Sequence, residues 1–382
     1  MKILVIGAGI AGLAMARMLT RLKIDFDIVE KRSRNDEHGT GIALPFNAVR
    51  CLKQLDLYAP LMEKAHKVSS ITYGKTNGSV LSRAKLTSKP FKDDIFVALL
   101  RKDLHSILME GLEDKIEFAC EATQFNEQKS SIEVHFNGSK ASAEYGLVIA
   151  ADGVYSAVRR HFEPQDSSTL VHPVKCWRFV GHLANHGLEP TYLFGKTDVF
   201  MAYPISADRI YGYAHVLADK TAPYHSLNNL EQLRLFFSDY SDPIPQLLAQ
   251  LHVRDILPGR VVSVAKPLFH RRRVAFIGDA SSACSPLLQQ GAASAFEDVL
   301  TLGRCLERQM QQKGSIKTAL SEYKNERSSR VKWIMNYSDK PYRALRKMNN
   351  PMISGLRNCL IRLRGPLNVT GWKRLAKMPG PF

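Results

Sequence analysis

The sequence lacks the usual marks of a membrane-spanning, disulfide-linked or metal-binding protein. No stretch reaches the ~18 uninterrupted apolar residues of a transmembrane helix, so no membrane span is expected. The six cysteines are scattered, without a Cys-x-x-Cys pair or a Cys/His cluster at metal-ligand spacing. These absences predict reduced thiols in a cytoplasmic protein and no metal site. Internal repeats and low-complexity linkers are absent as well.

Acidic residues are scarce, above all at the C-terminal end. The chain has 53 Lys and Arg against 36 Asp and Glu, a formal net charge of +17, and residues 340–382 contain ten basic side chains and no acidic one. A basic excess of this kind favours nucleic acid, anionic lipid or an acidic substrate as partner. Because no nucleic-acid-binding motif accompanies it, nucleic acid is the least favoured of the three.

Length and composition favour a globular protein of about two domains. Of the 382 residues, 45% are hydrophobic and 23% are charged, which is the balance of a chain with a large core. Lys2 and the apolar run from Ile3 to Ala16 have the character of a signal peptide. Glycines at positions 7, 9 and 12 favour a different interpretation: a buried strand, a tight turn and a helix.

The N-terminal segment predicts a βαβ unit that binds a dinucleotide. Residues 2–7 are expected to form a buried strand, residues 10–22 a helix and residues 25–30 the next strand. The glycine motif from Gly7 to Gly12 (GAGIAG) permits a tight turn, close approach to a pyrophosphate and close helix packing. The helix N-terminus offers free N–H groups and a positive dipole end to that diphosphate.

Glu30 ends the second strand, eighteen residues after Gly12. This spacing places its carboxylate to accept hydrogen bonds from a ribose 2′-OH. An acidic residue here selects an adenosine ribose without a 2′-phosphate, as in FAD or NAD. The alternative is a glycine-rich turn that only packs a helix, but the strand, the helix and Glu30 in register favour dinucleotide binding.

The rest of the chain predicts an inserted β-rich segment and then a return to the first sheet. We expect helices at 47–55 and 101–112, a strand at 147–152, a β-rich stretch at 164–270 with two helices near 228–251, a strand at 273–280, and helices at 292–311 and 316–337. Both ends of the insert would then lie beside one cofactor.

Two further motifs identify that cofactor. Residues 151–159 (ADGVYSAVR) and residues 278–298 (GDASSACSPLLQQGAASAFED) each follow an apolar strand. They resemble the D-G and G-D motifs of the flavoprotein hydroxylases typified by p-hydroxybenzoate and salicylate hydroxylases, the class A FAD-dependent monooxygenases. The resemblance spans most of the chain up to about residue 310.

The resemblance implies places for the parts of FAD. Asp152 would lie near the pyrophosphate and the nicotinamide route, Asp279 would bind the ribitol hydroxyls, and Pro286 would lie close to the isoalloxazine. Gly291 would open a helix aimed at the flavin N1/C2=O edge, where a helix N-terminus stabilises negative charge by about 0.3–1 kcal/mol or more. For Asp152, a strand-end residue that only caps a helix is the alternative.

Other residues match the family at single positions. Arg101, at the start of a helix, matches an Arg that contacts the cofactor, and Gly39, Gly41 and Ile42 match the loop beside the isoalloxazine. The sequence departs from many members at Ser282, where they have His, and at residues 289–291 (QQG), where they have Gly-Gln-Gly. The predicted cofactor residues are Gly7, Gly9, Ile10, Ala11, Gly12, Glu30, Lys31, Arg32, Gly41, Ile42, Arg101, Asp152, Gly153, Gly278, Asp279, Pro286, Gln290, Gly291 and Ala292.

The resemblance implies an FAD-dependent monooxygenase. It would use NADPH or NADH as a transient co-substrate and O2 to hydroxylate a small aromatic or quinone-like substrate through a flavin C4a-hydroperoxide. No nucleophile–base pair stands out, which fits chemistry carried by the cofactor, and no catalytic acid or base is assigned. His182, Tyr203 and Tyr213 are candidates for the substrate pocket, and ordinary half-buried strand residues are the alternative.

The expected fold is α/β: a Rossmann-like FAD-binding domain, an inserted β-sheet substrate domain and a C-terminal helical extension. We expect the FAD-binding domain at 1–163 and 271–338, the substrate domain at 164–270 and the basic extension at 339–382. By the family resemblance, NAD(P)H needs no second Rossmann domain.

The sequence bears on three alternatives to hydroxylation. A flavin-dependent halogenase is disfavoured because the W-x-W-x-I-P motif is absent. An isoprenoid- or quinone-modifying flavin oxidoreductase of the same superfamily stays open, as does a non-catalytic FAD-binding protein that associates with membranes.

The C-terminal extension contains an amphipathic basic segment. Apolar residues recur at helical spacing and arginines fall elsewhere on the helix. This pattern fits either a helix docked on the FAD domain or peripheral attachment to an anionic membrane. The apolar residues are Met352, Ile353, Leu356, Leu360 and Leu363, and the arginines are Arg357, Arg362 and Arg364.

Overall fold

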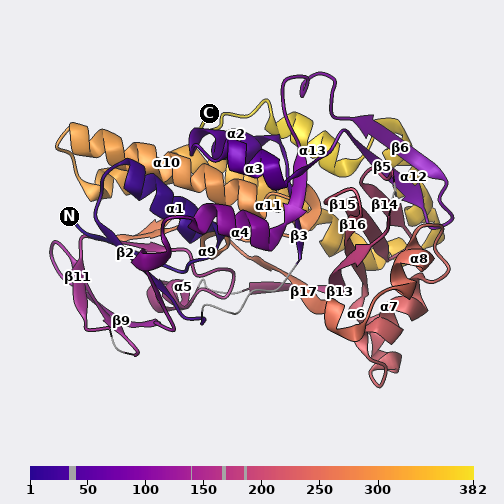
Figure 1. Ribbon diagram of the computed structural model, residues 1–382, viewed down its shortest axis with the longest axis horizontal. Coiled ribbons are helices and arrows are strands. Elements are labelled where there is room, and N and C mark those ends of the chain that lie inside the picture. The colour runs from indigo at the N-terminus through magenta and orange to yellow at the C-terminus, as the bar shows by residue number, and fades with distance from the viewer. Residues whose placement is uncertain (34–39, 139, 166–168, 185–186) are drawn as a thin grey trace.

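The computed structural model describes residues 1–33, 40–138, 140–165, 169–184 and 187–382. Gly39, one of the residues matched to the isoalloxazine loop, lies outside them. Along the longest axis, β2, β9 and β11 lie near one end of the molecule, and α7, α8 and α12 lie near the other (Figure 1). The described residues confirm the predicted α/β class.

A six-stranded sheet contains the predicted nucleotide-binding strands. Its order is β18 (His270–Arg271), β19 (Val274–Phe276), β12 (Leu147–Ala150), β1 (Ile3–Ile6), β2 (Phe26–Glu30) and β8 (Ile116–Phe118). The pairs from β19 to β8 are parallel, so the carboxyl ends of five strands meet at one edge. The central strands read ILVI and LVIA and are buried throughout, as expected of parallel strands covered on both faces.

Different elements cover the two faces of this sheet. Ile3 and Val5 of β1 pack into the core that contains α1 (Ile10–Arg21) and α10 (Gly291–Gln311). Leu4 and Ile6 point the other way, into a core shared with the small sheet of β9 (Ala122–Glu127), β10 (Ile132–Phe136) and β11 (Ala143–Tyr145). This alternation is the period of two that a β-strand imposes.

A seven-stranded sheet forms the other half of the molecule. Its order is β17 (Leu257–Val264), β13 (Thr169–His182), β16 (Arg209–Leu217), β15 (Val199–Pro204), β14 (Thr191–Phe194), β5 (Ser70–Lys75) and β6 (Val80–Lys85). Strands β5 and β6 come from the segment counted with the FAD-binding domain, so the boundary predicted at 163/164 does not separate the strands of the two sheets. The cause is the parallel pairing of β14 with β5, a contact between distant segments.

The remaining elements connect and cover these sheets. A short sheet joins β3 (Gly41–Leu44), β7 (Val97–Leu100) and β4 (His66–Lys67). The other helices are α2 (Phe46–Gln54), α3 (Tyr58–Lys64), α4 (Arg101–Met109), α5 (Ala157–Phe162), α6 (Ala218–Thr221), α7 (Asn229–Phe237), α8 (Ile244–Ala249), α9 (Asp279–Ser282), α11 (Ile316–Ala344), α12 (Pro351–Arg364) and α13 (Leu367–Leu375).

Helix α11 is longer than predicted. It was expected to end at Tyr337 but continues to Ala344, with Pro341 inside it. Ser338, Asp339 and Tyr342 are buried in this last part, so tertiary packing holds the helix where propensity would end it. The predicted boundary at 338/339 therefore falls within one continuous helix.

Candidate active site

The carboxyl edge of the six-stranded sheet brings the predicted motifs together. The glycine motif follows β1, Glu30 ends β2, Asp152 follows β12 and Gly278 follows β19. In an open parallel sheet, ligands bind at this edge. Segments more than 100 residues apart in the chain therefore face one region.

Glycine is required at several points of this edge because the backbone segments approach closely. A Cβ at Gly7, whose φ is +102°, would lie 2.7 Å from the Ala151 carbonyl oxygen, and a Cβ at Gly12 would lie 1.8 Å from the Gly7 carbonyl oxygen. At Gly9, by contrast, no described atom lies within 4 Å of the Cβ position. The turn is thus closed by Gly7 and Gly12 and left open at Gly9, the position where a pyrophosphate would approach.

Two backbone amides orient the carboxylate of Glu30. Ala8 N donates to Oε2 at 2.8 Å, and Arg32 N donates to Oε1 at 2.9 Å. Because each carboxylate oxygen has a second lone pair, both can still accept from a ribose hydroxyl. Lys31 and Arg32 are exposed beside it.

Asp152 caps α5, as its alternative interpretation predicted. Its Oδ2 accepts from Ala157 N at 2.8 Å and from Val158 N at 3.2 Å. Oδ1 is buried without a hydrogen-bond partner among the described residues, and burial raises the pKa of the carboxyl. A buried carboxylate oxygen without a hydrogen-bond partner is energetically costly. The helix cap therefore uses only Oδ2, and a donor on a bound ligand would supply the missing hydrogen bond to Oδ1.

Asp279 lies beside the start of α10. Its side chain is accessible to solvent, yet enough protein surrounds it that burial raises its pKa, while the nearby Arg101 opposes this rise. The Cβ position of Gly291 is 4.0 Å from Asp279 Oδ1, and Pro286 and Gly291 are exposed. A carboxylate, a cation and the N-terminus of α10 therefore lie close together, as the predicted binding of the ribitol and isoalloxazine of FAD requires.

Strand pairing joins Arg101, which lies near Asp279, to the Gly41 loop. Gly41 pairs with Leu100 across β3 and β7, and Arg101 N donates to the Thr40 carbonyl oxygen at 2.7 Å. A Cβ at Gly41 would lie 2.3 Å from Tyr211 Cβ, so this loop rests on the seven-stranded sheet. The predicted residues Arg101, Gly41 and Ile42 thus lie between the two sheets.

The side chain of Gln290 belongs to a buried hydrogen-bond network that the sequence analysis did not predict. Its side chain is buried and exchanges two hydrogen bonds with Asn47, at 2.8 and 3.2 Å. Asn47 also donates to Glu297 Oε1 at 2.7 Å, and Arg327 and Arg330 both donate to the Glu297 carboxylate. The prediction that Gln290 contacts FAD therefore rests on its backbone, while its side chain fixes the start of α10.

The inner face of the seven-stranded sheet closes the site on the other side. By inner face we mean the side chains that pack toward α11 and α13. One row crosses five neighbouring strands in register, and it consists of Arg178, Tyr213, Met201, Tyr192 and Tyr73. Gln289 Nε2 donates to the Tyr192 hydroxyl at 2.7 Å, which places this aromatic row against the loop that precedes α10.

Of the residues that the sequence suggested for the substrate pocket, two lie on the inner face and one lies in solvent. Tyr203 and Tyr213 are buried on the inner face. His182 does not line it, because its side chain is 70% exposed at the end of β13 and lies 3.9 Å from Asp208. Arg178 and Tyr211 were missed, although the alternation in the KCWRFVGH segment could have placed Arg178 on the same face as Val180 and Cys176.

The ionisation of the inner-face groups follows from burial and from Arg178. Burial raises the pKa of Tyr211 to about 12 although Arg178 opposes the rise, and burial also raises the pKa of Tyr213. The pKa of His215 falls to about 4 because burial disfavours the imidazolium. At neutral pH the described inner face thus presents neutral phenols, the neutral imidazole of His215 and the guanidinium of Arg178.

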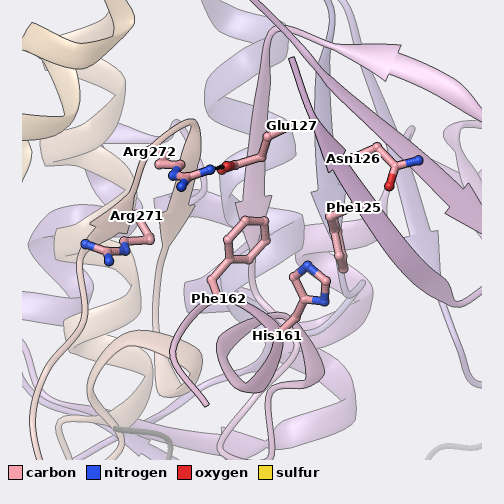
Figure 2. A pocket seen from close by; sticks show the side chains of 7 residues that line it. All are labelled: Phe125, Asn126, Glu127, His161, Phe162, Arg271 and Arg272. Carbon is pink, nitrogen blue, oxygen red and sulfur yellow. Dashed lines mark ion pairs between the residues drawn. The ribbon is translucent and has the colours of Figure 1, made fainter. Parts of the chain in front are cut away.

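A hollow lies outside this site, on the six-stranded-sheet half. It has a volume of about 540 Å³ and is lined by Phe125, Asn126, Glu127, His161, Phe162, Arg271 and Arg272. Figure 2 shows Arg272 turned toward Glu127, with which it forms an ion pair, and Arg271 pairs with Glu163 at 2.9 Å. None of the predicted cofactor residues lines this hollow.

Comparison with known proteins agrees with this geometry. The family described as FAD binding domain matches residues 1–233. The 2-heptyl-3-hydroxy-4(1H)-quinolone synthase of Pseudomonas aeruginosa is 32% identical over 376 residues, covering 95% of this chain and 94% of that protein. The 3-amino-4-hydroxybenzoate 2-monooxygenase of Streptomyces cremeus is 28% identical over 359 residues, covering 86% and 84%.

The chain belongs to the family of class A FAD-dependent monooxygenases. This monooxygenase is therefore an oxidoreductase with FAD as its cofactor, and NAD(P)H is the usual co-substrate of its family. The crystal structure of Klebsiella pneumoniae HpxO with FAD and uric acid has the same fold, with a TM-score of 0.83, 24% identity and coverage of 98% of this chain and 95% of that one. The predictions of family, fold class, cofactor and enzyme class are confirmed.

Replacing either carboxylate that is predicted to bind the cofactor is expected to weaken FAD binding. Asp279→Ala and Glu30→Ala should each raise the Kd for FAD by roughly 10- to 150-fold, because a hydrogen bond to a charged group contributes about 1.5–3 kcal/mol. Titration of the apoprotein followed by flavin fluorescence measures this. Glu133→Ala, on the distant strand β10, is the control. An unchanged Kd in either variant would remove that carboxylate from the site.

Proposed function

We propose that this monooxygenase hydroxylates a fused aromatic heterocycle of the 4(1H)-quinolone type at ring carbon 3. The observation that carries the proposal is the inner face, an aromatic wall with one guanidinium placed against both predicted flavin loops. The 32% identity to a 3-hydroxy-4(1H)-quinolone synthase over nearly the whole of both chains supports the choice of ring. The net reaction consumes the substrate, O2, NAD(P)H and a proton, and it releases the hydroxylated product, NAD(P)+ and water.

Bound FAD supplies the redox chemistry of this reaction, taking a hydride from NAD(P)H and activating O2 for transfer of one oxygen atom. The chain itself contributes binding, orientation and exclusion of water. The N-terminus of α10 lies beside Asp279 and would stabilise negative charge on the flavin there. The tyrosine row offers flat apolar surfaces and hydroxyl donors, which suit a planar ring that carries a carbonyl.

Arg178 is the residue that we assign to the substrate. It lies opposite Tyr213 in the strand register, and no carboxylate forms an ion pair with it in the part of the chain that the structure describes. Burial alone would lower the pKa of Arg178, but Cys176 and the surrounding tyrosines raise it above its ordinary value. A charged guanidinium on this face would bind the 4-oxo oxygen, and the resulting enolate character at carbon 3 would favour attack by that carbon on an electrophilic oxygen.

Substrate turnover with labelled oxygen tests the proposal. We expect 2-heptyl-4(1H)-quinolone to accelerate NAD(P)H oxidation and to yield the 3-hydroxy product with one atom from 18O2. A panel of monocyclic phenols, uric acid and isoprenoid quinones should be converted more slowly. Label from water would exclude oxygen transfer from O2, and conversion of an isoprenoid quinone alone would favour the quinone-modifying alternative.

The same assay isolates the contribution of Arg178. Arg178→Gln is expected to lower kcat/KM by roughly 10- to 100-fold, since it removes a charge-assisted hydrogen bond, while the Kd for FAD stays unchanged. Arg178→Lys keeps the charge without the planar donor pair and should restore part of the loss. An unchanged kcat/KM in Arg178→Gln would exclude this residue from substrate binding.

A further inference from the structure

Helix α12 carries an apolar stripe that faces solvent. Met352, Leu356, Leu360 and Leu363 follow one another at helical spacing and are 83%, 60%, 40% and 77% exposed. The other exposed large apolar side chains of the described residues are spread over several elements. Four on one face of a 14-residue helix are unusual for a surface that meets only water.

The opposite face of α12 packs against the rest of the protein, so the stripe faces solvent. Ile361 and Ser354 are buried there. Arg357 reaches across to the loop after β14, donating to the Gly195 carbonyl oxygen at 2.7 Å and stacking 5.4 Å from the Phe194 ring centre. Rotation of the helix to bury the stripe would break these contacts.

The charges around the stripe are basic. Arg362 and Arg364 are exposed at its flanks, and neither forms an ion pair within the described ranges. Residues 340–382 include no acidic side chain. In this segment two arginines lie near carboxylates outside it: Arg346 is 3.1 Å from Asp219, and Arg343 is 3.8 Å from Asp339. The segment keeps a positive excess beside exposed leucines.

We propose that α12 lies in the surface of an anionic lipid bilayer, with Met352, Leu356 and Leu363 among the acyl chains and Arg362 and Arg364 at the headgroups. An apolar face bordered by arginines is what an interfacial helix needs. Among the described residues, no helix has the length and apolar character needed to cross a membrane, so the contact is peripheral. This proposal does not depend on the identity of the substrate.

The tail also connects this surface to the active site. Helix α13 follows α12 after a two-residue link, and Trp372 Nε1 donates to the Leu288 carbonyl oxygen at 2.8 Å, in the loop between Pro286 and Gly291. Tyr337 of α11 donates to the Leu367 carbonyl oxygen at 3.1 Å. The bilayer contact and the flavin loop are therefore held by one packed unit, and attachment would set the active site at a fixed height above the membrane.

Vesicle flotation with the full chain tests the proposal. At low salt we expect the protein to float with vesicles of phosphatidylcholine and phosphatidylglycerol and to stay behind with phosphatidylcholine alone. Leu356→Glu with Leu363→Glu should lower the partition coefficient by about tenfold or more, because two apolar side chains no longer insert. Arg362→Gln and Arg364→Gln should each lower it about fivefold.

Matched controls separate insertion from charge. Leu235→Glu with Met310→Glu adds the same two charges at exposed apolar positions of α7 and α10 and should float like the unmodified protein. NAD(P)H oxidation without lipid should be the same in both double variants, which shows that they fold.

Three results would overturn the proposal. One is failure of the full chain to float with anionic vesicles at low salt. Another is flotation of the α12 double variant equal to that of the unmodified chain. The third is a dimer of the unmodified chain, seen by light scattering without lipid, together with no binding of that chain to vesicles. If the α12 double variant is then a monomer, the stripe is assigned to contact with a second copy of the chain.

Discussion

Replacing Glu297 by glutamine is expected to lower the free energy of unfolding by about 3–5 kcal/mol. The Glu297 carboxylate is fully buried and accepts from Arg327 Nη1 at 2.6 Å, from Arg330 Nε at 2.8 Å and from Asn47 Nδ2 at 2.7 Å. Glutamine would leave Arg330 without a carboxylate among the described residues and Arg327 with Asp298 only. Urea unfolding, followed by tryptophan fluorescence, measures the loss.

The pH dependence gives this prediction a second test. Although burial raises the pKa of Glu297, Arg327 and Arg330 overcome it and lower that pKa from 4.5 to about 2. A lowered pKa stabilises the fold above pH 4.5, and this stabilisation is lost as the pH falls from there toward 2. The difference in free energy of unfolding between the unmodified protein and Glu297→Gln should therefore shrink below pH 4.5.

A partly exposed glutamate provides the control for both measurements. Glu322→Gln removes an ion pair with Arg308 in which the two side chains are 30% and 45% exposed, and it should change stability by less than about 1 kcal/mol. Equal destabilisation by the Glu297 and Glu322 substitutions would contradict the role assigned to the buried network.

Replacing Gly12 by alanine is expected to abolish FAD retention during purification, with an increase in Kd of about a hundredfold or more. The new Cβ would lie 1.8 Å from the Gly7 carbonyl oxygen and 3.0 Å from its carbon. Both are backbone atoms, so the turn itself must open and the amides that face the pyrophosphate must move. The flavin-to-protein absorbance ratio and a fluorescence titration measure the loss.

Two further glycine substitutions separate the turn from the cofactor. Gly9→Ala meets no described atom within 4 Å, so it should leave the stability of the apoprotein unchanged while weakening FAD, because only the cofactor would occupy that space. Gly355→Ala, inside helix α12 with the same open surroundings, should leave FAD binding unchanged and raise stability by up to about 1 kcal/mol, because alanine favours a helix over glycine. FAD binding by Gly12→Ala as tight as that of the unmodified protein would refute the close packing of this turn.

Several parts of the site were predictable because local sequence specifies them. Only glycine fits the closed turn at Gly7 and Gly12, and Glu30 ends its strand at the spacing that a ribose requires. The apolar runs before Asp152 and Gly278 predicted parallel strands, and parallel strands necessarily bring their carboxyl ends to one edge. The amphipathic pattern of α12 was also visible, since its period is local.

Other features follow from contacts between distant segments, which no local pattern contains. The pairing of β5 with β14 moves residues 70–85 into the seven-stranded sheet, and burial of Tyr342 lets α11 continue through Pro341. Asn47 and Glu297 lie 250 residues apart and meet only because α2 packs on α10.

The sequence by itself determined the family, the α/β class and the cofactor, and it brought the predicted binding motifs to one edge of the sheet, because these depend on short motifs whose geometry is set within a few residues. Tertiary structure alone decided which face of β13 packs toward the flavin loops and where the covered part of that face ends, so that Arg178 lies on the inner face and His182, at the end of the strand, lies in solvent. It also decided that the apolar stripe of α12 points outward, because a helical pattern specifies a face but not what that face meets.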